Sequence, residues 1–181
     1  MPNTIWTMNV DQFVVVMDDP RGSGGTSALE GDNDPNGSLN EPRSAPTIFN
    51  ATLCGSGGRG ERVTRGMHLR RATRLTLGNS LVAGFHIGRE DLGEGIEAHL
   101  PGTAFFGQSQ VDYTATEPPA FSLEPGLVDC RGLAAIRPRE ALVHGAVAPP
   151  ADGFFDPHAR YLGAFRDADD AWVTGAWAGL Q

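Results

Sequence analysis

Lysine is absent from the 181-residue sequence, so all 14 of its basic side chains other than histidine are arginines. The 22 acidic residues outnumber them and give a formal net charge of −8. An acidic surface repels phosphate backbones and anionic headgroups, because bringing like charges together is unfavourable. We therefore expect neither a nucleic-acid partner nor membrane binding through a basic patch.

Long apolar runs are also missing. The run Phe13–Met17 is far shorter than the roughly 20 residues that a membrane-spanning helix needs, so no transmembrane segment is predicted. Met1–Thr4 shows neither a basic region nor the start of an apolar one, and no secretory signal is expected in this chain.

Cysteines and catalytic motifs are scarce. With only Cys54 and Cys130, one disulfide and two unpaired thiols both stay open. The sequence contains no nucleophile elbow, phosphate-binding loop, paired CxxC or HExxH. No particular reaction is therefore indicated by a motif.

Glycine and proline, in contrast, are plentiful, with 24 and 13 residues respectively. Together they make up about a fifth of the chain, which is typical of short strands joined by many turns. The composition thus favours an all-β protein over a helical one.

An internal repeat runs through the middle of the chain. Three evenly spaced segments align and place an amide side chain at Asn50, Asn79 and Gln108. We call the spacing from Asn50 to Asn79, which recurs from Asn79 to Gln108, the regular step. The apolar positions that repeat with it are Ile48, Leu77 and Phe106, and also Leu53, Val82 and Val111.

A second set of positions repeats in the same way. Gly66–Leu69 and Gly95–Ala98 are separated by the regular step, whereas Ala28–Gly31 precedes Gly66–Leu69 by a longer one. The additional length predicts a longer excursion within residues 31–65.

Stacked coils of a parallel solenoid explain this pattern, because a single repeat cannot bury its apolar side chains alone. We expect coils over residues 1–116 and a loop-rich C-terminal cap over 117–181 that covers the last coil. The amide positions should hydrogen-bond along the stack. The abrupt start predicts further coils upstream. Ordinary antiparallel strands with chance similarity remain the alternative.

Several stretches resemble a known group of proteins. They are residues 28–33, 42–47, 50–53, 65–71 and 79–85, with a closing segment at 161–165 followed by Trp172 and Trp177. In this order they resemble bacterial secreted or outer-membrane lipoprotein-like proteins with a right-handed parallel β-helix. The resemblance implies that fold with an irregular C-terminal cap, and an extracellular or outer-membrane location. It implies no activity, and it extends to polysaccharide lyases in fold only.

Candidate site residues follow from strand alternation. If Leu29, Met67 and Ile96 point inward, the residues beside them point outward and stack about 4.8 Å apart. The candidate catalytic residues are Glu30, His68, Arg70 and Glu97. The candidate ligand-binding residues, two positions further on, are Asp32, Arg70 and His99. A solvated face with scattered ion pairs is the simpler interpretation.

Metal binding is predicted at a turn that contains glycine. Oxygen atoms of Glu30, Asp32 and Asp34 surround a glycine and suit Ca²⁺, although aspartate is also an ordinary turn residue. No other cofactor is expected.

Three functional hypotheses remain. The first is a non-enzymatic surface or secreted module for structure, adhesion or glycan binding. The second is a carbohydrate-active enzyme, a lyase or hydrolase, that uses the outer polar face. The third is a subunit that self-associates through its coil ends.

Overall fold

The computed structural model describes residues 9–16, 26–55, 63–106, 121–122 and 135–174. Within these ranges the regular structure consists of ten strands and one short 3₁₀-helix, η1 (Trp172–Thr174). The strands are β1 (Asn9–Val16), β2 (Ser27–Gly31), β3 (Thr47–Cys54), β4 (Arg65–Arg70), β5 (Arg74–Gly78), β6 (Leu81–Ala83), β7 (Ile87–Leu92), β8 (Glu97–His99), β9 (Ala104–Phe106) and β10 (Phe121–Ser122).

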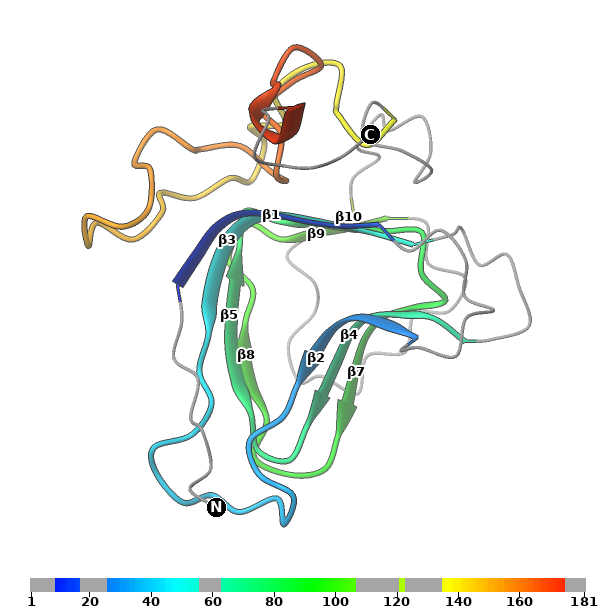
Figure 1. The fold of residues 1–181 in the computed structure, drawn as a ribbon, viewed down its shortest axis with the longest axis vertical. Coiled ribbons are helices and arrows are strands. Elements are labelled where there is room, and N and C mark those ends of the chain that lie inside the picture. The colour runs from blue at the N-terminus through cyan, green and yellow to red at the C-terminus, as the bar shows by residue number, and fades with distance from the viewer. Residues whose placement is uncertain (1–8, 17–25, 56–62, 107–120, 123–134, 175–181) are drawn as a thin grey trace.

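Every pairing between these strands is parallel. One sheet follows the order β10-β9-β6-β3-β5-β8, with β1 paired to β3, and a second sheet follows β2-β4-β7. Viewed down the stack, the larger sheet forms two sides around the core and β2-β4-β7 forms the third (Figure 1). The described strands therefore stack as coils, and the antiparallel alternative is wrong.

The corner between the two sides of the larger sheet lies at Asn50. The first half of β3 pairs with β5, and its second half pairs with β6. Ile48 lies beside Leu77 and Leu53 beside Val82, so the predicted regular step is confirmed between these two coils. The longer predicted step is also confirmed, by the pairing of Leu29 with Met67.

The next step is shorter than predicted. Phe106 pairs with Ala83 instead of Leu77, and Met67 pairs with Arg89 instead of Ile96. The reason is a shorter corner, because the connection from β6 to β7 is much shorter than the equivalent connection from β3 to β4. The predicted third copies at Gln108 and Val111 lie outside the described residues.

The interior is filled by apolar side chains from successive coils. Met67, Leu69, Leu77, Val82 and Phe85 are fully buried within it. Burying a side chain of this size contributes about 1.5–3 kcal/mol, so the repeated apolar positions hold the stack together.

Residues 135–174 lie along the flank of the stack rather than over its last coil. The Asn50 side chain donates to the Tyr161 carbonyl at 2.6 Å, and the Gly163 amide donates to the Asn79 carbonyl at 2.8 Å. Leu162 packs against Leu81 on β6. The asparagine amides thus bind the tail, and the expected ladder along the stack is wrong for them.

Left-handed backbone geometry explains why these asparagines turn outward. Asn50 has φ 55° and Asn79 has φ 47°, and Gly102 continues the corner with φ 67°. Asparagine tolerates this conformation better than most residues with a side chain. A Cβ at Gly102 would lie 2.7 Å from Asn79 Oδ1, so the next coil has no space there for an amide.

Cys54 is fully buried and disulfide-bonded. Cys130, the other cysteine of the sequence, lies outside the described residues.

Within the part of the chain that the structure describes, no helix has the length and apolar character needed to cross a bilayer.

Candidate functional site

The three-stranded sheet carries a row of charged side chains on its outer face. Glu30 of β2, His68 of β4 and Glu90 of β7 are register partners. Their neighbours Met67 and Leu69 are buried in the core, so alternation turns the three polar side chains outward. We call Glu30, His68 and Glu90, with Asp32, Arg65, Arg70 and Arg71 around them, the outer ionic row.

Arginine side chains pair with the carboxylates at one end of this row. Arg70 Nη2 lies 3.5 Å from Glu30 Oε2 and 3.3 Å from Asp32 Oδ2. Arg71 Nη1 approaches the same Asp32 oxygen to 2.7 Å. Sequence reasoning therefore brought together Glu30, Asp32, His68 and Arg70 correctly, but the carboxylates of Glu30 and Asp32 are already paired with arginines.

His68 occupies the centre of the outer ionic row and is only 15% exposed. Its Nε2 lies 3.2 Å from Glu90 Oε2 but is not aligned for a hydrogen bond, and Arg65 also pairs with Glu90. Burial lowers the pKa of His68; Glu90 opposes this shift, and Arg65 and Arg70 reinforce it. The imidazole is therefore neutral at neutral pH.

Glu97 and His99 do not belong to this row. They lie on β8 in the other sheet, where Glu97 pairs in register with Arg74 and His99 with Thr76. The prediction that both join Glu30 and His68 on one face is wrong, because the next coil places Arg89, and not Ile96, beside Met67.

Glu97 instead belongs to an ionic network that ties the β2–β3 connection to β8. It pairs with Arg43 and, at 3.0 Å, with Arg74 Nε, while Arg74 Nη2 lies 2.7 Å from Glu41. The hydrogen bond from Arg43, followed by that from Arg74, lowers the pKa of Glu97. The Arg74 hydrogen bond likewise lowers the pKa of Glu41.

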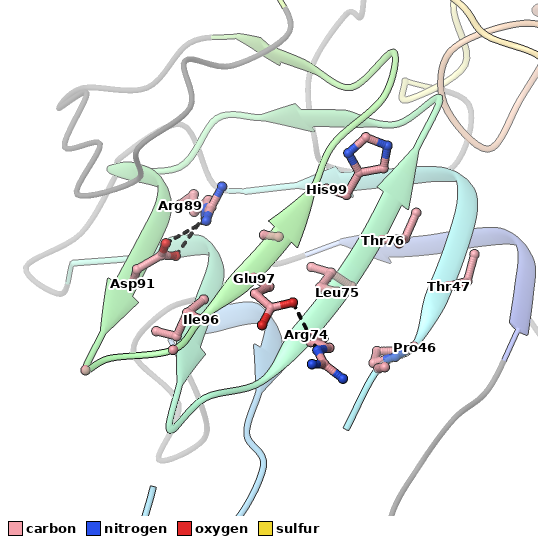
Figure 2. A pocket seen from close by; sticks show the side chains of 14 residues that line it. Pro46, Thr47, Arg74, Leu75, Thr76, Arg89, Asp91, Ile96, Glu97 and His99 are labelled. Atoms are coloured by element: carbon pink, nitrogen blue, oxygen red, sulfur yellow. Dashed lines mark hydrogen bonds and ion pairs between the residues drawn. The ribbon is translucent and has the colours of Figure 1, made fainter. Parts of the chain in front are cut away.

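A hollow of 680 Å³ lies beside β8, at the end of the described stack. Figure 2 shows Thr47, Thr76 and His99 on one side of it and Arg89 and Asp91 on the other. Its other lining residues are 45–46, 74–75, Gly93 and 95–98. The size falls within the range of small-molecule sites, which is about 300–1,000 Å³. We call this feature the β8 hollow.

An ion pair forms one wall of the β8 hollow. Arg89 Nε and Nη2 lie 2.8 and 2.6 Å from the two carboxylate oxygens of Asp91. Their side chains are 6% and 12% exposed, although they occupy positions stacked on Met67 and Leu69 of the core. Sequence reasoning missed this pair. The predicted step had placed Ile96 and Ala98 at these core positions, so no signal in the sequence marked Arg89 and Asp91 as interior residues.

Asp34, one of the three residues predicted to bind Ca²⁺, is already engaged by protein groups. Asp34 accepts hydrogen bonds from the amides of Asn36 and Ser38, at 2.7 and 3.1 Å, and from the Ser38 hydroxyl. The Ser38 hydroxyl is the main cause that lowers the pKa of Asp34. Among the described side chains no group of three His, Cys, Asp or Glu is placed to hold a metal ion. Calcium at Glu30, Asp32 and Asp34 thus stays a prediction that these contacts do not favour.

The sequence profile of the pectate-lyase-like β-helix domain matches residues 6–105. That range is more than half of the chain and contains the strands β1 to β8 described above. This chain belongs to the pectate-lyase-like β-helix domain family. Comparison with curated proteins gave no match, and comparison with solved structures gave none either.

Both candidate sites lie inside the matched range. The outer ionic row spans residues 30–90 and the β8 hollow spans residues 45–99. They are thus features of the β-helix domain itself and not of the tail that packs on its flank.

Proposed function

We propose that this β-helix domain is a non-enzymatic module that binds a polysaccharide outside the cell or at its surface, with the β8 hollow as the binding site. The observation that carries the proposal is the separation of the two sites. The hollow is open and polar, whereas the outer ionic row lies on a different sheet, where Glu30 and Asp32 pair with Arg70 and His68 lies beside Glu90.

The composition of the hollow suits a sugar chain. Guanidinium, carboxylate and imidazole groups can exchange hydrogen bonds with hydroxyls, which both donate and accept. Ile96 and Ala98, which are half-buried, add apolar surface for the C–H faces of sugar rings. Pockets that combine a few placed polar groups with apolar walls are typical of ligand sites.

The cellular location of the protein and the handedness of its coils belong to the same proposal. A disulfide at Cys54 supports an oxidising compartment, where such bonds persist. Parallel strands joined by crossovers in one sheet are right-handed in about 98% of cases, which supports right-handed coils. The narrower grouping with bacterial secreted or lipoprotein-like proteins stays an expectation from the sequence resemblance.

Affinity electrophoresis through gels that contain individual polysaccharides tests the proposal. Thr76→Trp places a large side chain into the β8 hollow from an outward strand position and should abolish retardation of the protein. Val143→Trp is the matched control, because Val143 is 63% exposed in the tail and does not line the hollow. Retardation that survives Thr76→Trp, or no retardation by any polysaccharide, contradicts the proposal.

A carbohydrate-active enzyme is the alternative that one observation favours. His68 is neutral, nearly buried and beside Glu90, so it could accept a proton from a sugar bound on the outer face. Turnover of a polysaccharide, measured as new reducing ends or as ultraviolet absorbance of an unsaturated product, should then vanish in His68→Gln and Arg70→Gln. Loss of turnover in these variants would replace the binding proposal with the enzymatic one.

Self-association through the coil ends is the third proposal. In the described sheets β7 and β8 are terminal strands at the same end of the stack, and strand edges are templates for pairing. Analytical ultracentrifugation tests this proposal. A protein that sediments only as a monomer at high concentration would contradict it.

A further inference from the structure

We infer that the β8 hollow selects neutral, hydroxyl-rich sugar chains and discriminates against uronates, the sugars that carry a carboxylate. The inference rests on the proposed function and names the substrate class of the same site. It depends on the balance of charge among the side chains that line the hollow.

The formal charges in the lining cancel. Arg74 and Arg89 contribute two positive charges, and Asp91 and Glu97 contribute two negative charges. His99 is the remaining titratable lining residue, on the exposed face of β8. A uronate would therefore add a negative charge to a neutral site on a chain of net charge −8.

Both arginines of the lining already hold protein carboxylates. Arg89 binds Asp91 through two nitrogens, and Arg74 lies between Glu41 and Glu97. A ligand carboxylate would lose water without gaining an uncommitted cation, and desolvating a charge without a partner is costly. Competing with Asp91 for Arg89 would break an ion pair whose side chains are only 6% and 12% exposed.

Sugar hydroxyls fit the same groups without displacing them. A paired carboxylate retains lone pairs that accept from a hydroxyl, and a guanidinium has five N–H donors. Figure 2 shows the third nitrogen of Arg89 turned away from Asp91. The ion pairs can thus serve as fixed donors and acceptors for a neutral ring, with little reorganisation of the protein.

Matched polysaccharide pairs give a direct test. The probes are polygalacturonate, polymannuronate and polyglucuronate, each with its carboxyl-reduced neutral counterpart, and affinity is measured on the full chain at several salt concentrations. We expect the neutral member of at least one pair to bind about tenfold more tightly than its acidic partner, a difference of about 1.4 kcal/mol. That affinity should depend little on salt.

Two variants shift the charge balance of the hollow by one unit. Asp91→Asn and Glu97→Gln should each reduce the ratio of the affinity for the neutral polymer to the affinity for its acidic partner. Each variant removes one carboxylate that pairs with an arginine of the lining, so that guanidinium can interact with a ligand carboxylate. Glu97 is exposed, so its variant keeps the test intact if Asp91→Asn does not fold. Glu94→Gln removes the same charge from a neighbouring exposed residue outside the lining and should leave the ratio unchanged.

The outcomes separate this inference from the proposed function. Tighter, salt-dependent binding of an acidic polymer that Thr76→Trp abolishes overturns the inference and leaves the β8 hollow as a glycan site. A ratio that neither charge variant changes also overturns the inference. Failure of all six probes and of the wider polysaccharide gels overturns the inference and the proposed function together.

Discussion

Asn79 links the stack to the tail at the scale of a single residue. It is fully buried and has φ 47°. Its Nδ2 donates to the carbonyls of Val147 and Ala159, at 2.9 and 3.2 Å, and its Oδ1 accepts from the Val147 amide at 2.8 Å. One side chain therefore satisfies three backbone groups of the tail.

Replacing Asn79 should release the tail from the stack. Asn79→Ala leaves those three groups unpaired and should lower the free energy of unfolding by about 2–4 kcal/mol. Asn79→Gly loses the same hydrogen bonds but accepts the positive φ, so it should cost about 1 kcal/mol less. Urea denaturation measures both values. An alanine variant as stable as wild type would contradict the role assigned to this corner.

His68 makes stability depend on pH near neutrality. Its pKa in the folded protein lies below the ordinary value of 6.5, so the unfolded state takes up more protons as the pH falls through that value. The free energy of unfolding should therefore be highest above pH 6.5 and decline below it. Denaturation of His68→Gln at about pH 7.5 and about pH 5.5 should show a smaller decline than wild type. The exposed His158→Gln is the control and should keep the wild-type decline.

At the scale of strands, close stacking depends on large residues facing glycine. Phe49 on β3 is the register partner of Gly78 on β5, and a Cβ at Gly78 would lie 2.3 Å from the Phe49 ring. Phe49 also contacts Phe155 of the tail, with ring centroids 5.3 Å apart. The ring thus bridges two coils and the tail.

Gly78→Ala should therefore destabilise the stack by about 1–3 kcal/mol, as overpacking usually does. Most of that loss should disappear when Gly78→Ala is made in a Phe49→Leu background, because the smaller side chain gives the new methyl group space. A double-mutant cycle by chemical denaturation measures the coupling. A coupling of zero would show that Phe49 does not lie over Gly78.

The ionic network around β8 should respond to acid. Glu41 and Glu97 have pKa values below their ordinary 4.5, so their contribution to stability is present above that pH and is lost as the pH falls below it. Between about pH 6 and about pH 3.5, wild type should lose more stability than Glu97→Gln. Glu94→Gln, which removes a neighbouring exposed carboxylate, should behave like wild type in the same denaturation series.

At the scale of the whole molecule, the sequence predicted the stacking principle but not all of the registers. The regular step and the longer step before it were readable because Leu29, Met67, Ile48 and Leu77 are apolar at matching offsets. The last coil could not be read in this way, because a shorter corner changes its step and its interior carries Arg89 and Asp91 instead of apolar residues.

The same limit applies to the prediction of the candidate sites. Glu30, Asp32, His68 and Arg70 gather on one face because their strands keep the predicted register. Glu97 and His99 were misplaced by the regular step and lie at the β8 hollow instead. Local spacing predicts neighbours within a coil, whereas the length of each corner decides which residues meet between coils.

Interstrand nuclear Overhauser effects across the larger sheet test the central claim, the parallel stacking of coils with a changing step, most directly. The account predicts that the backbone of Thr76 contacts Thr47 on one side and His99 on the other, with contacts advancing in the same chain direction on all three strands. Contacts from Thr76 to Phe105, which an unchanged regular step would place beside it, or contacts that run in opposite chain directions, would contradict it.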